Sequence, residues 1–373
     1  MDHVEHSSPG LSLSFLQLSH FRSHRLARIE VDPRPVAIYG PNGAGKTNIL
    51  EAISLLSPGR GLRGSSAEDM TRRPEAVGWK LHVHLSSLHQ VHDLEIWSEA
   101  GASRQTRIDG KTAPQTALGR IARVLWLVPS MDRLWIEGAE GRRRFLDRMT
   151  LSFEPEHADV SLAYEKAMRQ RNRLLKDMVR DAGWYRALEG QMAQAGTRIQ
   201  AHRRKALQQL SDAQRQAATV FPTATLELVQ PDELPDTEEA FFDALAQNRD
   251  RDLAAGRTLI GPHRSDLHGV YAAKDVPARD CSTGEQKALL VSLILANARA
   301  LARDFGAPPL LLLDEVAAHL DADRRAALYD EISALGAQAW MTGTGAELFD
   351  SLGDRAQYLE VTEQESVSSV RMI

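Results

Sequence analysis

Alternating apolar and polar residues predict strands in the first third of the chain. The segments with this pattern are LSLSFLQLSHF, ARIEV, WKLHVHLSSL and HDLEIWSE. Two shorter apolar runs, PVAIYG and ARVLWLVP, predict further strands. The first of these runs leads into GPNGAGKT, and helical spacing follows at once in NILEAISLL. A strand, a glycine-rich loop and a helix in this order indicate α/β character.

The middle of the chain has a helical pattern instead. Between residues 140 and 218, alanine, leucine, arginine and glutamine are frequent, and Pro155 is the only proline. The stretch AGWY interrupts the apolar spacing, so we predict two long helices joined near Gly183 as an αα-hairpin. Limbs of about 30–40 residues would be roughly 45–60 Å long.

α/β character returns toward the C-terminus. Before this return, FPTATLELV predicts a strand and EEAFFDALAQNRDRDLAAG predicts a helix. The α/β pattern itself begins again at GPHRSDLHGVY. The helical pattern of ALLVSLILANARALA begins just after Ser282, which would cap its exposed amides, and Glu285 would complete a capping box. Four leucines at 310–313 predict a strand buried on both faces of a parallel sheet.

Composition narrows the class of protein. The chain has 373 residues, of which 43% are hydrophobic and 25% charged, as expected of a globular protein with a substantial core. No apolar run approaches the ~18–20 residues of a membrane-spanning helix, and MDHVEHSSPG lacks the features of a signal peptide. The single cysteine, Cys281, excludes an internal disulfide or a cysteine-based zinc cluster and fits a reducing cytoplasm. A net charge of −5 argues against coating of nucleic acid by global charge but allows a local basic groove.

Histidine spacing gives no clear indication of a metal site. The nearest cluster among the 13 histidines is His82, His84, His89 and His92. We interpret these residues as alternating positions on strands rather than as metal ligands.

The segment GPNGAGKT matches the phosphate-binding pattern G-x-x-x-x-G-K-[ST]. Its glycines allow consecutive amides to point at an anion, and the dipole of the following helix adds to the attraction. Lys46 would place its charge on the terminal phosphates, and the Thr47 hydroxyl would join the shell of a Mg²⁺ ion. The predicted nucleotide-binding residues here are Gly40, Pro41, Asn42, Gly43, Ala44, Gly45, Lys46 and Thr47.

Two acidic residues for the same site follow the leucine run. Asp314 would lie at the carboxyl end of a parallel strand, where open α/β sheets bind ligands, and we predict that it ligates Mg²⁺ directly or through water. Glu315 is the predicted catalytic acid, directed at the attacking water. The expected cofactors are therefore ATP and Mg²⁺. The simpler interpretation is a core strand followed by a solvated acidic pair.

The helix start at Ser282 resembles the signature loop of the ABC-type ATPases, where Ser-x-Gly-acid-Gln lies upstream of a hydrophobic Asp-Glu strand. The resemblance implies that this loop caps the γ-phosphate bound to a partner subunit's P-loop, so that ATP joins two copies head to tail. Ser282, Gly284 and Glu285 would then act in trans. Asp321, in the stretch HLD, matches the D-loop at the dimer interface of this superfamily.

More specifically, the chain resembles the RecF family, in the SMC-like branch of these ATPases. The matching stretches are LSLSFLQLSHFRSH, GPNGAGKTNILEAISLL, GRGLR, GRRRFLD, GPHRSDL, CSTGEQKALLVSLILA, LLLLDEVAAHLDADRR and MTGTGAELF. The resemblance implies an α/β fold: an ABC-type P-loop ATPase head built from an N-terminal part at 1–137 and a C-terminal part at 259–373, with a helical arm domain inserted at 138–258.

A function also follows from this resemblance. It implies ATP-dependent homodimerisation on DNA at gaps and at junctions of single-stranded and double-stranded DNA, with weak ATP hydrolysis. Members of the family act with RecR and RecO to help load RecA in recombinational repair, replication restart and the SOS response. The implied partners are therefore DNA, RecR, RecO and RecA, in the cytoplasm and away from any membrane.

Two positions depart from the ABC pattern. The Q-loop glutamine is expected within VPSMDRL, where Ser130 or Met131 stands instead. The switch histidine is replaced near MTGT, with Thr342 as the stand-in. Both changes predict slow hydrolysis, suited to a timer rather than a motor.

Basic residues of the arm are the candidate DNA contacts, since phosphate contacts give affinity without sequence preference. For any single one of them, a solvated helix face is the simpler interpretation. The candidates are Arg142, Arg143, Arg144, Arg169, Arg171, Arg173, Arg203, Arg204 and Lys205. Arg22 and Arg264 are expected instead to be structural or to approach the nucleotide.

Two other functions stay open at this point. An ATP-gated dimeric scaffold with little hydrolysis would show no turnover stimulated by DNA. A small-molecule P-loop kinase would have no use for the signature loop.

Overall fold

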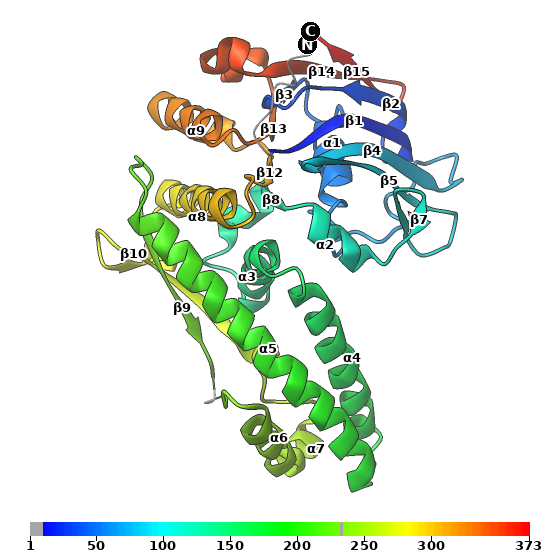
Figure 1. Ribbon diagram of the computed structural model, residues 1–373, viewed down its shortest axis with the longest axis vertical. Coiled ribbons are helices and arrows are strands. Elements are labelled where there is room, and N and C mark those ends of the chain that lie inside the picture. Colours follow the sequence, from blue (N-terminus) through cyan, green and yellow to red (C-terminus); the bar gives the residue numbers. More distant parts are fainter. Residues whose placement is uncertain (1–9, 232–233) are drawn as a thin grey trace, which may run out of the picture. The chain divides into compact units, whose positions relative to one another are not determined.

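The computed structural model describes residues 10–231 and 234–373, which form two compact units (Figure 1). The segment MDHVEHSSPG, for which no signal peptide is expected, lies outside the described residues except for Gly10. The first unit combines the described part of Met1–Asp132 with Gln216–Thr223 and Ser282–Ile373. The second unit combines Arg133–Arg215 with Ala224–Cys281.

The first unit contains an antiparallel sheet whose strands run in the order β2-β1-β4-β5-β6-β7. The period-two pattern of the sequence is realised here, because alternate residues Leu81, Val83 and Leu85 of β4 are fully buried while His82 and His84 stay partly exposed. The strands are β1 (Gly10–Phe21), β2 (His24–Glu30), β4 (Trp79–Leu88), β5 (Gln90–Ser98), β6 (Gln105–Ile108) and β7 (Lys111–Thr112).

A second sheet in this unit has the order β15-β14-β3-β13-β12-β8. All its pairs are parallel except the hairpin of β14 and β15. The leucine run forms β12, whose four residues are all buried, as the sequence predicts. The strands are β3 (Val36–Tyr39), β8 (Val124–Leu127), β12 (Leu310–Leu313), β13 (Ala339–Gly343), β14 (Gln357–Gln364) and β15 (Val367–Met372).

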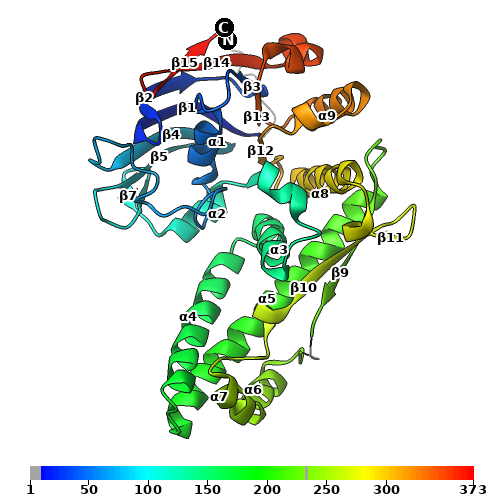
Figure 2. The same cartoon turned by 180° about the vertical axis from the view of Figure 1, so that it is seen from behind.

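Helices cover both faces of the parallel sheet, as Figures 1 and 2 show, with α1 on one face and α8 and α9 on the other. Such coverage explains why the strands between them are apolar on both sides. The helices of this unit are α1 (Lys46–Ser54), α2 (Leu118–Ile121), α8 (Thr283–Asp304) and α9 (Ala322–Leu335).

Gln338, just before β13, joins the two sheets through its buried side chain. Its Oε1 accepts from the amide of Leu13 at 2.8 Å, and its Nε2 donates to the carbonyls of Leu13 and Asp32 at 2.9 and 2.8 Å. A buried amide with its donors and acceptors paired fixes the distance between β1 and β13. This connection holds the antiparallel sheet against the strand that carries Thr342.

The second unit is mainly helical, and the predicted αα-hairpin is formed by α4 (His157–Lys176) and α5 (Ala182–Arg215). The 34 residues of α5 make a helix about 51 Å long. A third helix, α3 (Ala139–Phe153), precedes the hairpin, and Gly183 lies in the first turn of α5 rather than in the connection. The predicted helix after residue 237 is two helices, α6 (Glu238–Gln247) and α7 (Arg249–Ala255).

Close packing fixes α6 on α5. A Cβ atom added to Gly196 of α5 would lie 2.5 Å from the ring of Phe241 in α6, so glycine is needed for this approach. Tyr164, Met192 and Leu245 complete the same buried cluster. Among the described helices of both units, none is long and apolar enough to cross a membrane.

The second unit extends further along the chain than the predicted insertion at 138–258. The reason is strand pairing: β10 (Asp266–Tyr271) pairs in antiparallel register with β9 (Ala224–Val229) and also with β11 (Val276–Pro277). Residues up to Cys281 therefore pack with the helices.

Candidate nucleotide-binding site

The glycine-rich loop joins β3 to α1 and depends on backbone shapes that other residues rarely adopt. Gly40 and Gly45 have φ angles of 148° and 104°. A Cβ atom at Gly40 would lie 2.0 Å from the carbonyl oxygen of Val361, and one at Gly45 would lie 2.4 Å from the hydroxyl of Ser368. The loop therefore packs directly on β14 and β15, which leaves room only for glycine at these positions.

A buried histidine supports the loop from β2. Burial lowers the pKa of His24, so the ring is neutral, and its Nε2 lies 3.1 Å from the carbonyl oxygen of Gly45. A neutral ring that donates from Nε2 fixes the peptide at the start of α1.

Lys46 is only 5% exposed and folds over the loop. Its Nζ donates to the carbonyl oxygens of Gly40 and Pro41 at 2.7 and 2.9 Å. Burial lowers the pKa of Lys46, while the charges of Glu315 and Asp314 oppose this effect. The ammonium group therefore lies inside the loop, where the phosphates of a nucleotide would lie.

Asp314 follows β12 and receives two hydroxyl groups. The Oγ1 of Thr47 donates to its Oδ1 at 2.9 Å, and the Oγ1 of Thr342 donates to the same oxygen at 2.8 Å. Thr342 lies on β13, the parallel neighbour of β12, where Leu313 pairs with Met341. The carboxyl ends of adjacent strands thus bring Asp314 next to the P-loop, as the sequence predicts.

Glu315 is held in a strained conformation beside Asp314. Its φ angle of 53° lies in the left-handed region that residues other than glycine seldom adopt. The amide of Glu315 donates to Thr342 Oγ1 at 2.9 Å. One buried hydroxyl therefore positions both acidic residues, since Thr342 accepts from one and donates to the other.

The residues present fit a magnesium nucleotide. The Thr47 hydroxyl and the Asp314 carboxylate are hard oxygen donors of the kind Mg²⁺ prefers, and they already lie within hydrogen-bonding distance of each other. The loop with its left-handed glycines, followed by a helix N-terminus, fits an anionic phosphate chain.

The predicted capping box at the start of α8 is present. The amide of Glu285 donates to Ser282 Oγ, while the Glu285 carboxylate accepts from the Ser282 amide at 2.8 Å. The Ser282 hydroxyl also donates to Glu285. Ser282 and Gly284 are exposed, and a Cβ atom built at Gly284 would meet nothing within 4 Å. Ser282 and Gly284 are therefore open to solvent at this helix start, as a role in trans requires.

Asp321 caps the next helix. It is exposed and its carboxylate accepts from the amide of Arg324 at 2.8 Å, at the N-terminus of α9.

Ser130, one of the two Q-loop candidates, is exposed, and Met131 packs partly buried against the core. The charged contact from this segment to α8 is made by Asp132, whose carboxylate lies 3.3 Å from the Nζ of Lys287.

A buried acid on α1 was not among the predicted site residues. Glu51 is fully buried and pairs with Arg22 at 2.7 Å and with Arg63 at 2.8 Å, and Arg63 also donates to Asn48. These arginines belong to the stretches FRSH and GRGLR, so the structural role expected for Arg22 is confirmed. An acid inside the apolar helix NILEAISLL was the available signal, because a buried carboxylate requires a cationic partner.

An open groove of about 610 Å³ lies beside the phosphate-binding loop. Gly43 and Asn48 form its edge toward the loop. The rest of the lining is polar, with three arginines and two acids: Arg22, Arg72, Arg73, Asp69 and Glu363. A groove of this volume and polarity, continuous with the loop, has room for the rest of a nucleotide.

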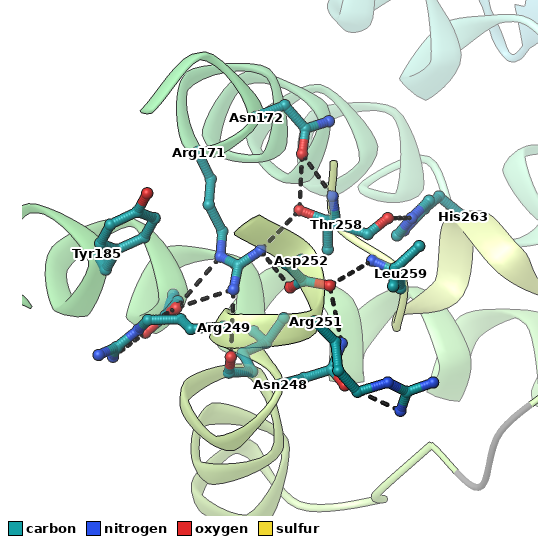
Figure 3. A network of polar contacts seen from close by, with 12 residues as sticks. Arg171, Asn172, Tyr185, Asn248, Arg249, Arg251, Asp252, Thr258, Leu259 and His263 are labelled. Carbon is teal, nitrogen blue, oxygen red and sulfur yellow. Dashed lines mark hydrogen bonds and ion pairs between the residues drawn. The ribbon is translucent and has the colours of Figure 1, made fainter. Parts of the chain in front are cut away.

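Arg171 cannot contact DNA, because its side chain is fully buried inside the second unit (Figure 3). It donates to Asp252 at 2.6 Å, to Glu189 at 3.0 Å and to the Thr258 hydroxyl at 2.9 Å. The prediction of a DNA contact is wrong for this residue. A guanidinium group on the packed face of α4 joins four segments of the unit instead.

Arg203 and Arg142 are also engaged within the second unit. Arg203 is 4% exposed and forms a two-pronged pair with Asp147 at 2.7 and 2.9 Å, which corrects its predicted role in DNA binding. Arg142 pairs in the same way with Asp266 at 2.7 and 2.8 Å and has a side-chain exposure of only 13%. Arg143 donates to the carbonyl of Ser265.

The remaining candidates stand on the surface. Arg144, Arg169, Arg204 and Lys205 form exposed pairs with acidic neighbours, and such pairs contribute little and open easily. Arg173 is exposed as well. Of the original set, these five residues are the exposed ones.

Comparison with known proteins agrees with this architecture. Residues 12–368 match the family model described as RecF/RecN/SMC N terminal domain. The DNA replication and repair protein RecF of Brucella suis biovar 1 (strain 1330) is 46% identical over 374 residues, covering 97% of each chain. RecF of Rhizobium meliloti (strain 1021) is 44% identical, covering 94% of this chain and 96% of its own.

Solved structures show the same fold. A structure of the recombination mediator protein RecF with ATP has a TM-score of 0.82 at 23% identity and covers 99% of this chain and 100% of its own. The Smc head domain with an extended coiled coil from Pyrococcus furiosus has a TM-score of 0.56 at 17% identity and covers 97% of this chain and 96% of its own.

Fold and site together define an ATPase head of the ABC type, in the form found in SMC proteins. Within that class, the chain belongs to the RecF family of DNA replication and repair proteins.

Proposed function

We propose that the chain binds ATP with Mg²⁺ at the P-loop, hydrolyses it slowly, and pairs with a second copy on DNA. The observation that carries the proposal is the hydrogen-bonded chain from Thr47 through Asp314 to Thr342 and the Glu315 amide. It brings metal-binding oxygens and a second acid to one edge of the sheet, next to a loop suited to phosphates.

Each of these residues and Lys46 has a distinct role. Lys46 leaves the carbonyls of Gly40 and Pro41 to contact the terminal phosphates. Thr47 and Asp314 hold Mg²⁺, which when bound neutralises phosphate charge. Glu315 orients a water molecule and accepts its proton, which requires a fixed backbone beside Asp314.

Head-to-tail pairing of two copies follows from the exposed start of α8. Ser282 and Gly284 are open to solvent, and the helix N-terminus attracts an anion. A phosphate bound to one chain would therefore be capped by Ser282 of the second. In the capped state the Ser282 hydroxyl exchanges its bond to Glu285 for one to the phosphate.

Placement on DNA rests on the relatives. The curated relatives are named DNA replication and repair proteins, and the solved RecF structures are described as belonging to the RecFOR pathway. We extend this to gaps and junctions of single-stranded and double-stranded DNA, with RecR and RecO as partners in loading RecA. Arg144, Arg169, Arg173, Arg204 and Lys205 are the proposed phosphate contacts.

An ATP-gated scaffold with little hydrolysis is the second candidate. Glu315→Gln distinguishes the two, with Glu239→Gln, an exposed acid on α6, as the control. Slow turnover stimulated by gapped DNA, abolished by Glu315→Gln and kept by Glu239→Gln, supports the ATPase. Wild-type protein with no turnover above that of Glu315→Gln supports the scaffold.

A P-loop kinase for small molecules is tested by Ser282→Arg. A kinase would retain full turnover, because its site lies within one chain. The proposed shared site loses turnover, since an arginine at the helix start fills the space that the phosphate needs.

A further inference from the structure

Two histidines and an aspartate, none of which belongs to the nucleotide-binding site, converge on the exposed face of the antiparallel sheet. His82 and His84 are two residues apart on β4, so their side chains leave the same face. Asp93 stands directly opposite His84 on β5. The sheet register thus brings together three potential metal ligands that span 11 positions of the sequence, from His82 to Asp93.

The three side chains point at a common position. His82 Nε2 lies 3.0 Å from Asp93 Oδ2, and His84 Nε2 lies 3.7 Å from the same oxygen. All three ligand atoms lie within 4.8 Å of one another. In a zinc tetrahedron with bonds of about 2.0–2.2 Å, neighbouring ligand atoms lie roughly 3.3–3.6 Å apart, so small side-chain rotations would bring the three ligand atoms to these separations.

The backbone under the cluster is rigid. Leu81, Val83 and Leu85 alternate with the histidines and are fully buried in the core. The amide of Asp93 donates to Asp109 Oδ1 at 2.9 Å, and the amide of Asp109 donates back to the Asp93 carbonyl at 2.8 Å. The backbone of Asp93 is therefore held in place by Asp109.

Phe15 of β1 restricts the histidine rings from the third strand. Its ring centroid lies 5.5 Å from that of His82 and 5.0 Å from that of His84. An aromatic wall of this kind limits ring rotation and places low-polarity surface beside the ligands. The ligands themselves keep 30, 43 and 53% of their side-chain area exposed, so an ion and its remaining water ligands can enter.

We propose that His82, His84 and Asp93 form a surface site for a divalent transition-metal ion such as Zn²⁺. Two imidazole nitrogens and one carboxylate form a ligand set that selects zinc-like ions over Mg²⁺, which prefers oxygen ligands in an octahedron. The site is therefore chemically distinct from the Thr47–Asp314 pair. It is independent of the proposed ATPase function.

A neighbouring pair shows what a purely structural contact looks like. His92 lies on the buried face of β5, the strand that carries Asp93. Its Nδ1 lies 2.8 Å from an oxygen of the Asp109 carboxylate, and its side chain is only 9% exposed. There a single histidine meets a single carboxylate, whose other oxygen accepts from the Asp93 amide. The exposed cluster differs because two rings compete for one carboxylate oxygen, an arrangement that a bound cation would satisfy in full.

Zinc titration of the full chain, purified without a polyhistidine tag, tests the proposal. The probe is Zn²⁺ in the presence of millimolar Mg²⁺, measured by calorimetry and by competition with a chromophoric chelator. One Zn²⁺ per chain is expected to bind, and His82→Ala, His84→Ala and Asp93→Asn should each weaken binding by at least the roughly 10–100-fold that loss of an outer-shell partner costs.

His89→Ala is the matched control, since His89 is exposed at the turn just after β4. It should bind Zn²⁺ as the wild type does. All variants change side chains that are at least partly exposed, and unchanged thermal unfolding confirms that they fold. The proposal is overturned if wild-type protein binds no Zn²⁺, or if the His82→Ala/His84→Ala double variant binds it with unchanged affinity.

Discussion

Thr342 donates a 2.8 Å hydrogen bond to Asp314 from the neighbouring parallel strand and accepts a 2.9 Å bond from the amide of Glu315. Thr342 is only 1% exposed, so bulk water does not compete for these two bonds. Thr342, which the sequence predicts as the stand-in for the switch histidine, therefore orients both acids with a hydroxyl that does not change its protonation state near neutral pH.

Replacing Thr342 with valine keeps the volume and removes both hydrogen bonds. We expect the ATP turnover number to fall roughly 10–100-fold, as for the loss of other outer-shell partners, while ATP affinity changes little. Steady-state turnover and nucleotide binding measured on the same preparation separate these effects. Thr150→Val is the control, because Thr150 is fully buried but its hydroxyl has no partner among the described residues. Equal turnover in the two variants would show that Thr342 has no positioning role.

Arg171→Met should destabilise the helical unit by about 3–5 kcal/mol, because it leaves Glu189 and Asp252 buried with fewer cationic partners. Amide hydrogen exchange across α4–α7 measures the loss locally. Arg169→Ala removes an exposed pair on the same helix and should cost about 0–1 kcal/mol. If both variants exchanged alike, the buried network would not stabilise the unit.

Acid should weaken the helical unit through His263. Burial lowers the pKa of this histidine to about 4 from its ordinary 6.5, with Tyr164 Oη 2.8 Å from its Nδ1. Below pH 6.5 the unfolded chain binds a proton that the folded chain excludes until about pH 4. Stability is therefore lost across this window, by at most about 3 kcal/mol, and changes no further below it.

Glutamine at position 263 does not titrate and isolates this contribution. The free energy of unfolding of His263→Gln should fall less steeply between pH 6.5 and 4 than that of the wild type. Local hydrogen exchange at both ends of the window gives the comparison. Parallel pH curves for the two proteins would contradict the assignment.

Among the DNA candidates, surface position decides which variants should matter. Arg173→Ala with Arg204→Ala should weaken duplex binding equally for all sequences and lower the slope of log affinity against log salt by about 2. Arg120→Ala, an exposed arginine of α2, serves as the control. An unchanged slope in the double variant would remove these two arginines from the interface.

Local signals explain what the sequence could predict. β4 coincides with WKLHVHLSSL because period-two burial is readable from apolar spacing alone. The capping box of Ser282 and Glu285 needs only residues three apart. The P-loop with Asp314 was found because both signals are short and each lies at the end of a buried strand.

Contacts between residues far apart in the sequence could not be predicted from local patterns. Arg171 continues the apolar face marked by Tyr164, Met168 and Leu175, so its spacing already indicated burial. Its partners Glu189 and Asp252 are 18 and 81 residues away, however, and no local pattern connects them. Asp93 likewise meets His84 only through the register of β4 and β5.

The central claim is that each nucleotide lies between Lys46 of one chain and Ser282 of another. Lys46→Ala should lose ATP affinity and with it ATP-dependent pairing. Ser282→Asp keeps the helix cap but adds a negative charge against the phosphates, so it should fold normally and fail to pair. Thr237→Asp makes the same change at the cap of α6 and should pair like the wild type.

Sedimentation of the two defective variants mixed together is the decisive measurement. With ATP and Mg²⁺, a mixed pair has one complete site, formed by Lys46 of the Ser282→Asp chain and Ser282 of the Lys46→Ala chain. The mixture should therefore form dimers that neither variant forms alone. A mixture that sediments as the sum of its two monomeric components would contradict the shared site.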